Sequence, residues 1–276
     1  MLLPELRGIG ACFVATGSQD QRVLGAAAMT QSCRTQPHAG PGIAVEVIAA
    51  SRRQGIATGL LAQLELAARQ TFDARALYAA TRVEHGSAHK QGWEWLGFQP
   101  IEKVEEHELP TARFDSELGP LVDRMRARGR IPADAEIVPL YKANAPAVLQ
   151  LHLDQMGGDR GDLYRKLRGH GTGAFHPRYS RVLLVDGRVK GCILAHRAAT
   201  DVAAVDADIV DPSLRGGWAN VWLKLDATRG AIRLGIKTFR FTTFDHYTDT
   251  RSFTDRLGGV TVRTTHLMVR PIALRD

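Results

Sequence analysis

The sequence predicts an α/β protein of two similar domains, each a mixed, mostly antiparallel twisted sheet flanked by helices. Two observations predict this fold class. Short strand-like runs alternate with helical stretches whose apolar residues recur at helical spacing. The order of these segments then restarts in the second half, and an internal repeat of this kind indicates two copies of one fold. With 276 residues and 44% hydrophobic content, the chain is large enough to bury such cores.

The first half begins with a predicted hairpin, followed by a third strand and a helix. The helix is expected from Gly55 to about Phe72, because its apolar residues fall on one face. A strand, a short helix and a further strand complete this half. The expected strands are at 10 to 16, 23 to 31, about 43 to 48, 75 to 81 and from Phe98, and the short helix lies in 87 to 97.

Residues 110 to 135 change character and are interpreted as a linker with one exposed helix. Three prolines punctuate this segment, and the arginines of its DRMRARGR stretch form no apolar face. The predicted domains are therefore residues 1 to 109 and 136 to 276.

The second half repeats the first from its hairpin onward, with one strand and two helices added in front. Its hairpin turns at Asp186 and Gly187. The expected strands are at about 136 to 141, 180 to 186, 189 to 197, 203 to 210, 238 to 243 and beyond Val260, and the helices at 144 to 155, 161 to 168, 217 to 234 and about 249 to 257.

Charge and cysteine content limit the possible partners. The 36 Lys and Arg against 29 Asp and Glu leave +7, which fits a phosphate-bearing ligand or nucleic acid, and equally an ordinary solvated surface. No aromatic residues lie between the arginines of DRMRARGR for base stacking, so the sequence does not favour nucleic acid. Neither a disulfide framework nor a zinc site is indicated by the spacing of Cys12, Cys33 and Cys192.

The expected cellular compartment follows from the lack of a secretory signal and of a membrane span in the sequence. Residues 1 to 15 carry Pro4 and Arg7 before any long apolar run, and make a poor secretory signal. No segment approaches the ~20 apolar residues of a membrane span. We therefore expect a cytoplasmic protein with no membrane partner and no metal.

One short loop carries the clearest chemistry. The SRRQGIA stretch, residues 51 to 57, follows a strand and opens a helix. Free N–H groups at a helix start converge on an anion, the helix dipole adds to the attraction, and small residues let the backbone approach closely. Two arginines at a helix N-terminus oppose the dipole unless an anion lies there. The loop is predicted to hold a phosphate, although it is neither a Walker P-loop nor a dinucleotide fingerprint.

This loop, the strand before it, the helix after it and the later GWEWLGF segment at 92 to 98 resemble the GCN5-related N-acetyltransferase (GNAT) family. The resemblance covers residues 10 to about 108. It implies that acetyl coenzyme A is the cofactor and that Val47 and Ile48 lie along its pantetheine arm. By position in the motif, the residues that would cradle its pyrophosphate are Arg52, Arg53, Gln54, Gly55, Ile56, Ala57 and Thr58.

The second half contains a weaker copy of the loop, VDPSLRGGWAN at residues 210 to 220. When it is aligned with the family pattern on Val210, Pro212 and Arg215, Trp218 takes the place of the first required glycine and Asn220 that of the second. An indole there is expected to crowd a pyrophosphate. An alignment shifted by one residue recovers Gly217 and Ala219 but places Leu214 where the pattern has Arg or Gln. The second copy is therefore predicted to be the poorer cofactor site.

The catalytic residues are less defined. Many family members use a tyrosine five residues before the phenylalanine of the LGF signature as the acid, but this sequence has Trp93 there. Acyl transfer to an amine still needs a base and an acid. Substitutes at the end of the preceding strand and the start of that helix are Glu84, His85 and His89. Of these, His85 is expected to act as base or acid, and is equally explained as a surface histidine.

Two further candidates lie elsewhere. Glu46 alternates with Val45 and Val47 on the cofactor strand, so it is expected to face the opposite way and to act as a base or remain an exposed strand residue. Tyr247 and its neighbour His246 occupy the corresponding strand-to-helix junction of the second half. They are predicted either to complete a site or to pack.

The leading hypothesis is an N-acetyltransferase that moves an acetyl group from acetyl coenzyme A, held by the first copy, to a small-molecule or peptide amine. The first copy lacks the strand and two helices that usually form the acceptor side, and we expect the second half to wall that pocket. A non-catalytic coenzyme A-binding or protein-interaction module is the alternative, and an acetyltransferase acting on RNA is a third possibility. The acceptor itself is not encoded in the shared motif.

Overall fold

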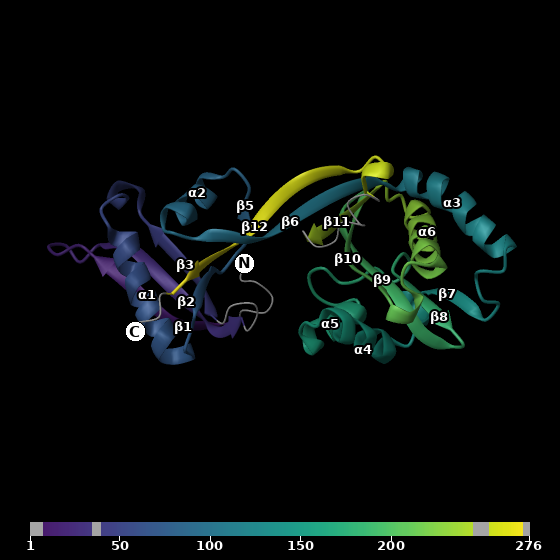
Figure 1. Cartoon of the computed structure of the whole chain (residues 1–276), viewed down its shortest axis with the longest axis horizontal. Helices are drawn as coiled ribbons and strands as arrows, with labels where there is room; N and C mark the ends of the chain where they lie inside the picture. The colour runs from purple at the N-terminus through teal and green to yellow at the C-terminus, as the bar shows by residue number, and fades with distance from the viewer. Residues whose placement is uncertain (1–7, 35–39, 245–253, 273–276) are drawn as a thin grey trace. The chain divides into compact units, whose positions relative to one another are not determined.

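The computed structural model describes residues 8–34, 40–244 and 254–272 and divides the chain into two compact units (Figure 1). Unit 1 consists of Met1–Val104 and Arg263–Asp276, and unit 2 of Glu105–Val262. Both are mixed, mostly antiparallel sheets flanked by helices, as the sequence predicts. No helix in the described ranges has the length and apolar character needed to cross a membrane.

The sheet of unit 1 has the strand order β1-β2-β3-β4-β12-β6. Of β6 and β12, only the parts up to Val104 and from Arg263 onward belong to this unit. Neighbouring strands are antiparallel from β1 to β3 and parallel between β3 and β4. Its elements are β1 (Ile9–Thr16), β2 (Val23–Arg34), β3 (Gly40–Val47), η1 (Ala49–Ser51), α1 (Ile56–Phe72), β4 (Ala76–Ala79), β5 (Val83–Glu84), α2 (Ala88–Trp95), β6 (Gln99–Pro110) and β12 (Val260–Pro271).

Helix α1 lies across β1, β2 and β3 and covers one face of their sheet (Figure 1). It forms because Leu60, Leu61, Leu64 and Ala68 recur at helical spacing, and all four are buried in the core of unit 1. On β1, the alternate residues turned to this core, such as Phe13, pack against it. The apolar face of α1 and the inward-facing residues of β1 therefore pack into the same core.

Unit 2 repeats this arrangement and adds layers on the other face. The turn at Asp186 and Gly187 has φ values of 51° and 67°, as a two-residue hairpin requires. Successive residues of β9 alternate between two cores: Cys192 packs under α4 and α5, and Ile193 under α6. Its other elements are α3 (Thr111–Ala127), β7 (Ala135–Pro139), η2 (Leu140–Lys142), α4 (Ala145–Met156), α5 (Arg160–Leu167), β8 (Arg181–Val185), β9 (Arg188–Ala199), β10 (Val202–Val210), η3 (Pro212–Leu214), α6 (Trp218–Ile232) and β11 (Thr238–Phe244).

The expected linker at 110 to 135 is corrected by helix α3, which is part of unit 2. Phe114, Leu118 and Val122 recur every four residues, are all at most 5% exposed, and belong to the core that includes α6 residues. The prolines and arginines that suggested a linker occupy the other sides of the helix, where Pro120 is exposed. Four-residue spacing places the three apolar side chains on one stripe, and that stripe is sufficient to pack the helix.

The chain ends in unit 1, which differs from the expected C-terminal domain of residues 136 to 276. β12 begins in unit 2 and finishes in unit 1, where Val269 pairs with Tyr78 and Pro271 with Ala76 of β4 in antiparallel register. The side chains of Leu267 and Val269 are buried with those of Ala76 and Tyr78. β4 would otherwise expose an apolar edge, so β12 satisfies both its backbone groups and its side chains.

Candidate functional site

The candidate site of unit 1 lies where two parallel strands separate. β3 and β4 pair only through Gly42 with Tyr78 and Ile43 with Ala79, after which Ala80 N donates to Ile43 O at 2.8 Å. From Ala44 onward the described residues place no strand beside this edge of β3, although its other edge continues to pair with β2 as far as Val47. The separation leaves an open backbone edge at the carboxyl end of β3.

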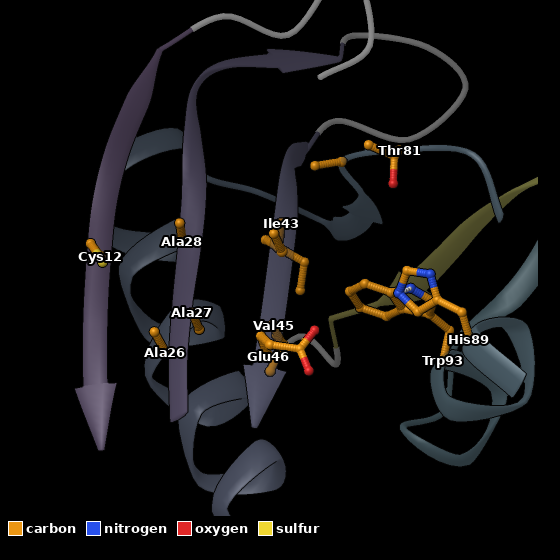
Figure 2. A pocket seen from close by; sticks show the side chains of 12 residues that line it. Cys12, Ala26, Ala27, Ala28, Ile43, Val45, Glu46, Thr81, His89 and Trp93 are labelled. Atoms are coloured by element: carbon orange, nitrogen blue, oxygen red, sulfur yellow. Dashed lines mark hydrogen bonds between the residues drawn. The ribbon is translucent and has the colours of Figure 1, made fainter. Parts of the chain in front are cut away.

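A cleft of about 410 Å³ occupies this gap (Figure 2). Mostly small and apolar side chains from β1 to β3 line one side of it, and the two residues after β4 together with α2 line the other. Figure 2 shows Glu46 projecting from β3 on the side where His89 and Trp93 project from α2. The lining residues are Cys12, Ala26, Ala27, Ala28, Ile43, Ala44, Val45, Glu46, Ala80, Thr81, His89 and Trp93.

The loop that follows β3 leads directly into α1 and keeps the start of that helix open. Arg53 and Gly55 have φ values of 63° and 81°, and Gly55 is the N-cap residue. No described side chain caps α1, and Gly59 N is the amide that bonds Gly55 O, so the amides before it lie ahead of the helical ladder. A Cβ built on Gly55 would meet no described atom within 4 Å. The helix start is therefore accessible to a ligand.

The two arginines of this loop differ in what they contact. Arg52 Nη2 donates to Glu46 Oε1 at 3.0 Å, and Arg52 Nε donates to Val47 O at 3.0 Å. The side chain of Arg52 is therefore engaged with β3, whereas both arginines were expected to surround the anion. Arg53 is exposed and takes the left-handed conformation that turns the chain toward α1.

Solved structures share this fold along more than nine-tenths of the chain. A tandem GNAT protein from the clavulanic acid biosynthesis pathway has a TM-score of 0.56 at 16% identity, over 94% of this chain and 82% of that one. A GCN5-related N-acetyltransferase from Sphaerobacter thermophilus gives 0.60 at 12% identity, over 96% and 82%. A glucosamine N-acetyltransferase region of a fungal multi-domain β-N-acetylglucosaminidase gives 0.61 at 13%, over 93% of this chain and 32% of that one.

This chain has a tandem GNAT fold. The predicted resemblance is thereby confirmed at the level of the fold. No family model matches the sequence, and no curated protein was found to be similar to it.

In the second GNAT-like unit the corresponding loop is one residue shorter. Arg52 to Gly55 separate η1 from α1, whereas Arg215 to Gly217 separate η3 from α6. Arg215 has φ −65° and ψ 150°, close to −67° and 155° for Arg52, so these two arginines correspond. Gly216, with φ 71°, then corresponds to Arg53. The counterpart of Gly55 with its left-handed backbone is missing, since the N-cap Gly217 is extended.

In and next to the corresponding loop of unit 2, side chains are hydrogen-bonded to neighbouring elements. Arg215 Nη2 donates to Gln155 Oε1 of α4 at 2.6 Å, and Asn220 Nδ2 donates to Asp208 Oδ1 of β10 at 3.3 Å. Trp218 is the first residue of α6, is half-buried, and lies 6.0 Å from Trp222 between ring centroids. A bulky indole thus stands at the helix start, where unit 1 has Ile56 after an open glycine.

The candidate catalytic residues of the GNAT-like unit 1 are only partly brought together. Glu46 lines the cleft and faces away from the buried Val47, as the strand alternation predicts. Glu84 belongs to β5 and His85 follows it, and neither is among the residues that line the cleft. His85 Nδ1 instead lies 3.0 Å from His266 Nε2 of β12. Tyr247 and His246 lie outside the described residues.

His89, one of the substitutes that the sequence offered for the missing acid, lines the cleft together with Trp93. Trp93 Nε1 donates to His89 Nε2 at 3.1 Å. The signal was present in the four-residue spacing of the two on one helix, which places their side chains on the same face. His89 and Trp93 were considered separately from the sequence, and it was not predicted that they form a pair.

Unit 2 carries a separate group of titratable side chains at an irregularity of β10, where the register with β9 shifts between Val205 and Ala207. Asp206, at this point, lies 3.2 Å from His196 Nδ1. Burial raises the pKa of Asp206, although His196 and Lys166 oppose the shift. Burial lowers the pKa of His152 on α4, which also faces Asp206 and Lys166.

The acceptor side of the fold differs between the units. Unit 2 has β7, α4 and α5 ahead of its hairpin, whereas residues 8–34 and 40–104 of unit 1 begin with β1 and contain no counterpart of them. The expected incompleteness of the first copy stays a prediction. Walling of its pocket by the second half stays a prediction.

Proposed function

We propose that unit 1 binds acetyl coenzyme A and transfers its acetyl group to an amine of a small molecule or peptide. One observation carries this proposal: an open strand edge with an apolar cleft and an uncapped helix start lie at the same end of β3. A ligand with a phosphate group and a narrow, amide-bearing arm fits such a combination. The GNAT fold supports acyl transfer as the reaction class.

The helix start fits the pyrophosphate. Amide N–H groups of Ile56, Ala57 and Thr58 precede the helical ladder, and the dipole of the 17-residue α1 favours an anion at this end. Gly55 adds no side chain above them, and Arg53 supplies an exposed positive charge. Gln54 is tethered to the loop by its amide, whose Nε2 donates to Ala50 O at 3.4 Å.

The strand edge fits the pantetheine arm. Amide groups of such an arm can pair with the backbone of β3 beyond Ile43 in the manner of an added strand. Val47 and Ile48 lie where β3 leads into the loop, and the Val47 side chain itself is buried in unit 1. Their proposed contribution is therefore through the backbone, and Val47 O already accepts from Arg52.

Bound there, acetyl coenzyme A would supply a thioester that an amine can attack. Among the described residues that line the cleft, Glu46 supplies the carboxylate, and we assign it the role of accepting the proton of the amine, directly or through water. Its bond to Arg52 fixes the direction of the side chain. Glu84 and His85 receive no role in this proposal, and a role for Tyr247 stays a prediction.

The test compares two glycines with the same backbone strain. Gly55 and Gly216 both have positive φ, and neither Cβ would meet a described atom within 4 Å, so Gly55→Val and Gly216→Val should cost about the same stability, on the order of 1–3 kcal/mol. Calorimetric titration with coenzyme A should show loss of binding by at least about tenfold for Gly55→Val. Gly216→Val should bind like the wild type. Equal losses would contradict the assignment of the cofactor to unit 1.

Trp93 favours one alternative, a coenzyme A-binding module without transfer, because an indole cannot act as the acid that the family tyrosine supplies. A thiol-release assay with acetyl coenzyme A and a panel of amines separates the two functions. Release with any amine supports the enzyme. Binding of coenzyme A without thiol release across the panel supports the binding module.

A further inference from the structure

We propose that Trp93 and His89 form a built-in hydrogen-bond donor in the cleft of unit 1. In this arrangement Trp93 holds His89 as the tautomer that carries its proton on Nδ1, and this N–H donates to the carbonyl oxygen of an acyl group. The inference rests on the proposed function of unit 1. His89 is then a catalytic residue and Trp93 a positioning residue.

The tautomer follows from the chemistry of the two rings. Indole Nε1–H can only donate a hydrogen bond, and it lies 3.1 Å from His89 Nε2. His89 Nε2 must therefore present its lone pair, which leaves the proton of the neutral ring on Nδ1. A second proton on Nε2 would place two N–H groups against each other. The hydrogen bond thus fits only the neutral imidazole.

Trp93 is rigid enough to impose this choice. Its side chain is buried, at 5% exposure, and its ring packs edge-on against Phe98 with 4.6 Å between centroids and 67° between planes. Helix α2 itself has a fixed start, because Ser87 Oγ accepts from Lys90 N at 3.1 Å. His89, one turn before Trp93, is therefore hydrogen-bonded to a side chain whose position is fixed by packing.

The free nitrogen faces no competing acceptor within the described ranges, since Nδ1 of His89 has no hydrogen bond to any residue there. The ring lines the same cleft as Ala44, Val45 and Glu46 of β3 (Figure 2). A donor at this place would stabilise negative charge that develops on a carbonyl oxygen. His89 contributes only a hydrogen bond, so no covalent bond forms or breaks at its ring.

Nuclear magnetic resonance of the ligand-free protein tests the tautomer without any activity. Nitrogen shifts of the His89 imidazole should show the Nδ1–H form in the wild type and a mixture of tautomers in Trp93→Phe, which keeps a ring against Phe98 but loses the N–H. Trp95→Phe is the matched control, since Trp95 is 69% exposed on the same helix. An Nε2–H form in the wild type, or an unchanged tautomer in Trp93→Phe, would overturn the positioning role.

The donor role is tested by the affinity ratio between acetyl coenzyme A and coenzyme A, measured by calorimetry. His89→Ala should lower the preference for the acetylated form about fivefold, the effect of one net hydrogen bond. His89→Asn should restore it, because its amide nitrogen takes the place of Nδ1. An unchanged ratio in His89→Ala overturns the donor role. Failure of both ligands to bind the wild type instead overturns the proposed function, while the tautomer measurement still decides the positioning role.

Discussion

Among single residues, the neighbouring arginines in the loop after β3 differ in their contacts. The guanidinium of Arg52 is committed to Glu46 and to the Val47 carbonyl, whereas the exposed Arg53 follows it on a left-handed backbone. A sequence shows two adjacent positive charges and cannot show which one an acidic side chain six residues earlier will engage. The open helix start after this loop was predictable, but the different contacts of Arg52 and Arg53 were not.

We therefore expect Arg53→Asn to weaken coenzyme A binding about tenfold at low salt, since an exposed charge-assisted contact to phosphate is lost. Asparagine tolerates positive φ, so the backbone is not strained. Calorimetric titration at increasing salt should show the difference from the wild type shrinking as the charge is screened.

Arg53→Lys is the matched control and should retain most of the affinity. Arg52→Ala should act mainly on Glu46, by freeing its carboxylate, rather than on cofactor affinity. An equal loss of affinity in Arg52→Ala would show that Arg52 leaves Glu46 when the ligand binds.

At the scale of elements, helix α3 shows where local pattern reading succeeded and failed. The alternation of β9 and the apolar face of α1 were predictable because each is a regular local repeat. In residues 110 to 135, the prolines and arginines led to the prediction of a linker, because the apolar stripe consists of only three side chains. The stripe prevails because α3 packs against α6, where Arg229 of α6 also bonds Asp115 of α3 at 2.7 Å and Arg126 of α3 lies 5.4 Å from the Trp222 ring of α6.

If α3 is an integral helix of unit 2, Leu118→Ala should destabilise the protein by about 2–5 kcal/mol, because the buried side chain leaves a cavity. Glu117→Ala, on the exposed side of the same turn, should change the free energy of unfolding by less than about 0.5 kcal/mol. Urea unfolding of both variants measures this. Small effects from both would mean that α3 behaves as the linker expected from sequence.

At the scale of the whole molecule, acid stability should depend on histidines in unit 2. Burial lowers the pKa of His152 and of His176 below the ordinary value of 6.5, and Arg197 and Arg178 add to the effect at His176. A depressed folded-state pKa contributes stability above 6.5 that is lost as the pH falls through the folded value. Asp206 has the opposite sign: its raised pKa contributes stability below 3.8 that is lost as the pH rises.

The free energy of unfolding should therefore fall between about pH 7 and about pH 5, and the decline should be shallower when both histidines are replaced by glutamine. Urea unfolding followed by tryptophan fluorescence measures it, because Trp218 and Trp222 lie in the same unit. His170→Gln, an exposed histidine of unit 2, is the control and should leave the slope unchanged. An equally steep decline in the double variant would locate the acid sensitivity elsewhere.

The route of β12 was beyond sequence reasoning for a different reason. Its residues were predicted as a strand and form one, but the choice of the β4 edge as partner depends on contacts far apart in sequence, since Val269 pairs with Tyr78. Periodicity reports which side of a strand is buried and carries no record of its neighbour. For the same reason, the sequence could not show that His266 lies beside His85.

This path of the chain has a consequence for protein synthesis. A ribosome delivers the whole of unit 2 as one uninterrupted stretch, so that unit can fold while translation is still under way. Most of unit 1 precedes unit 2 in the chain, yet its closing strand, from Arg263 onward, is synthesised only after the whole of unit 2. In the meantime the edge of β4 with its apolar Tyr78 has no partner strand from the C-terminus, and a nascent chain stalled at that point would present an aggregation-prone edge to chaperones.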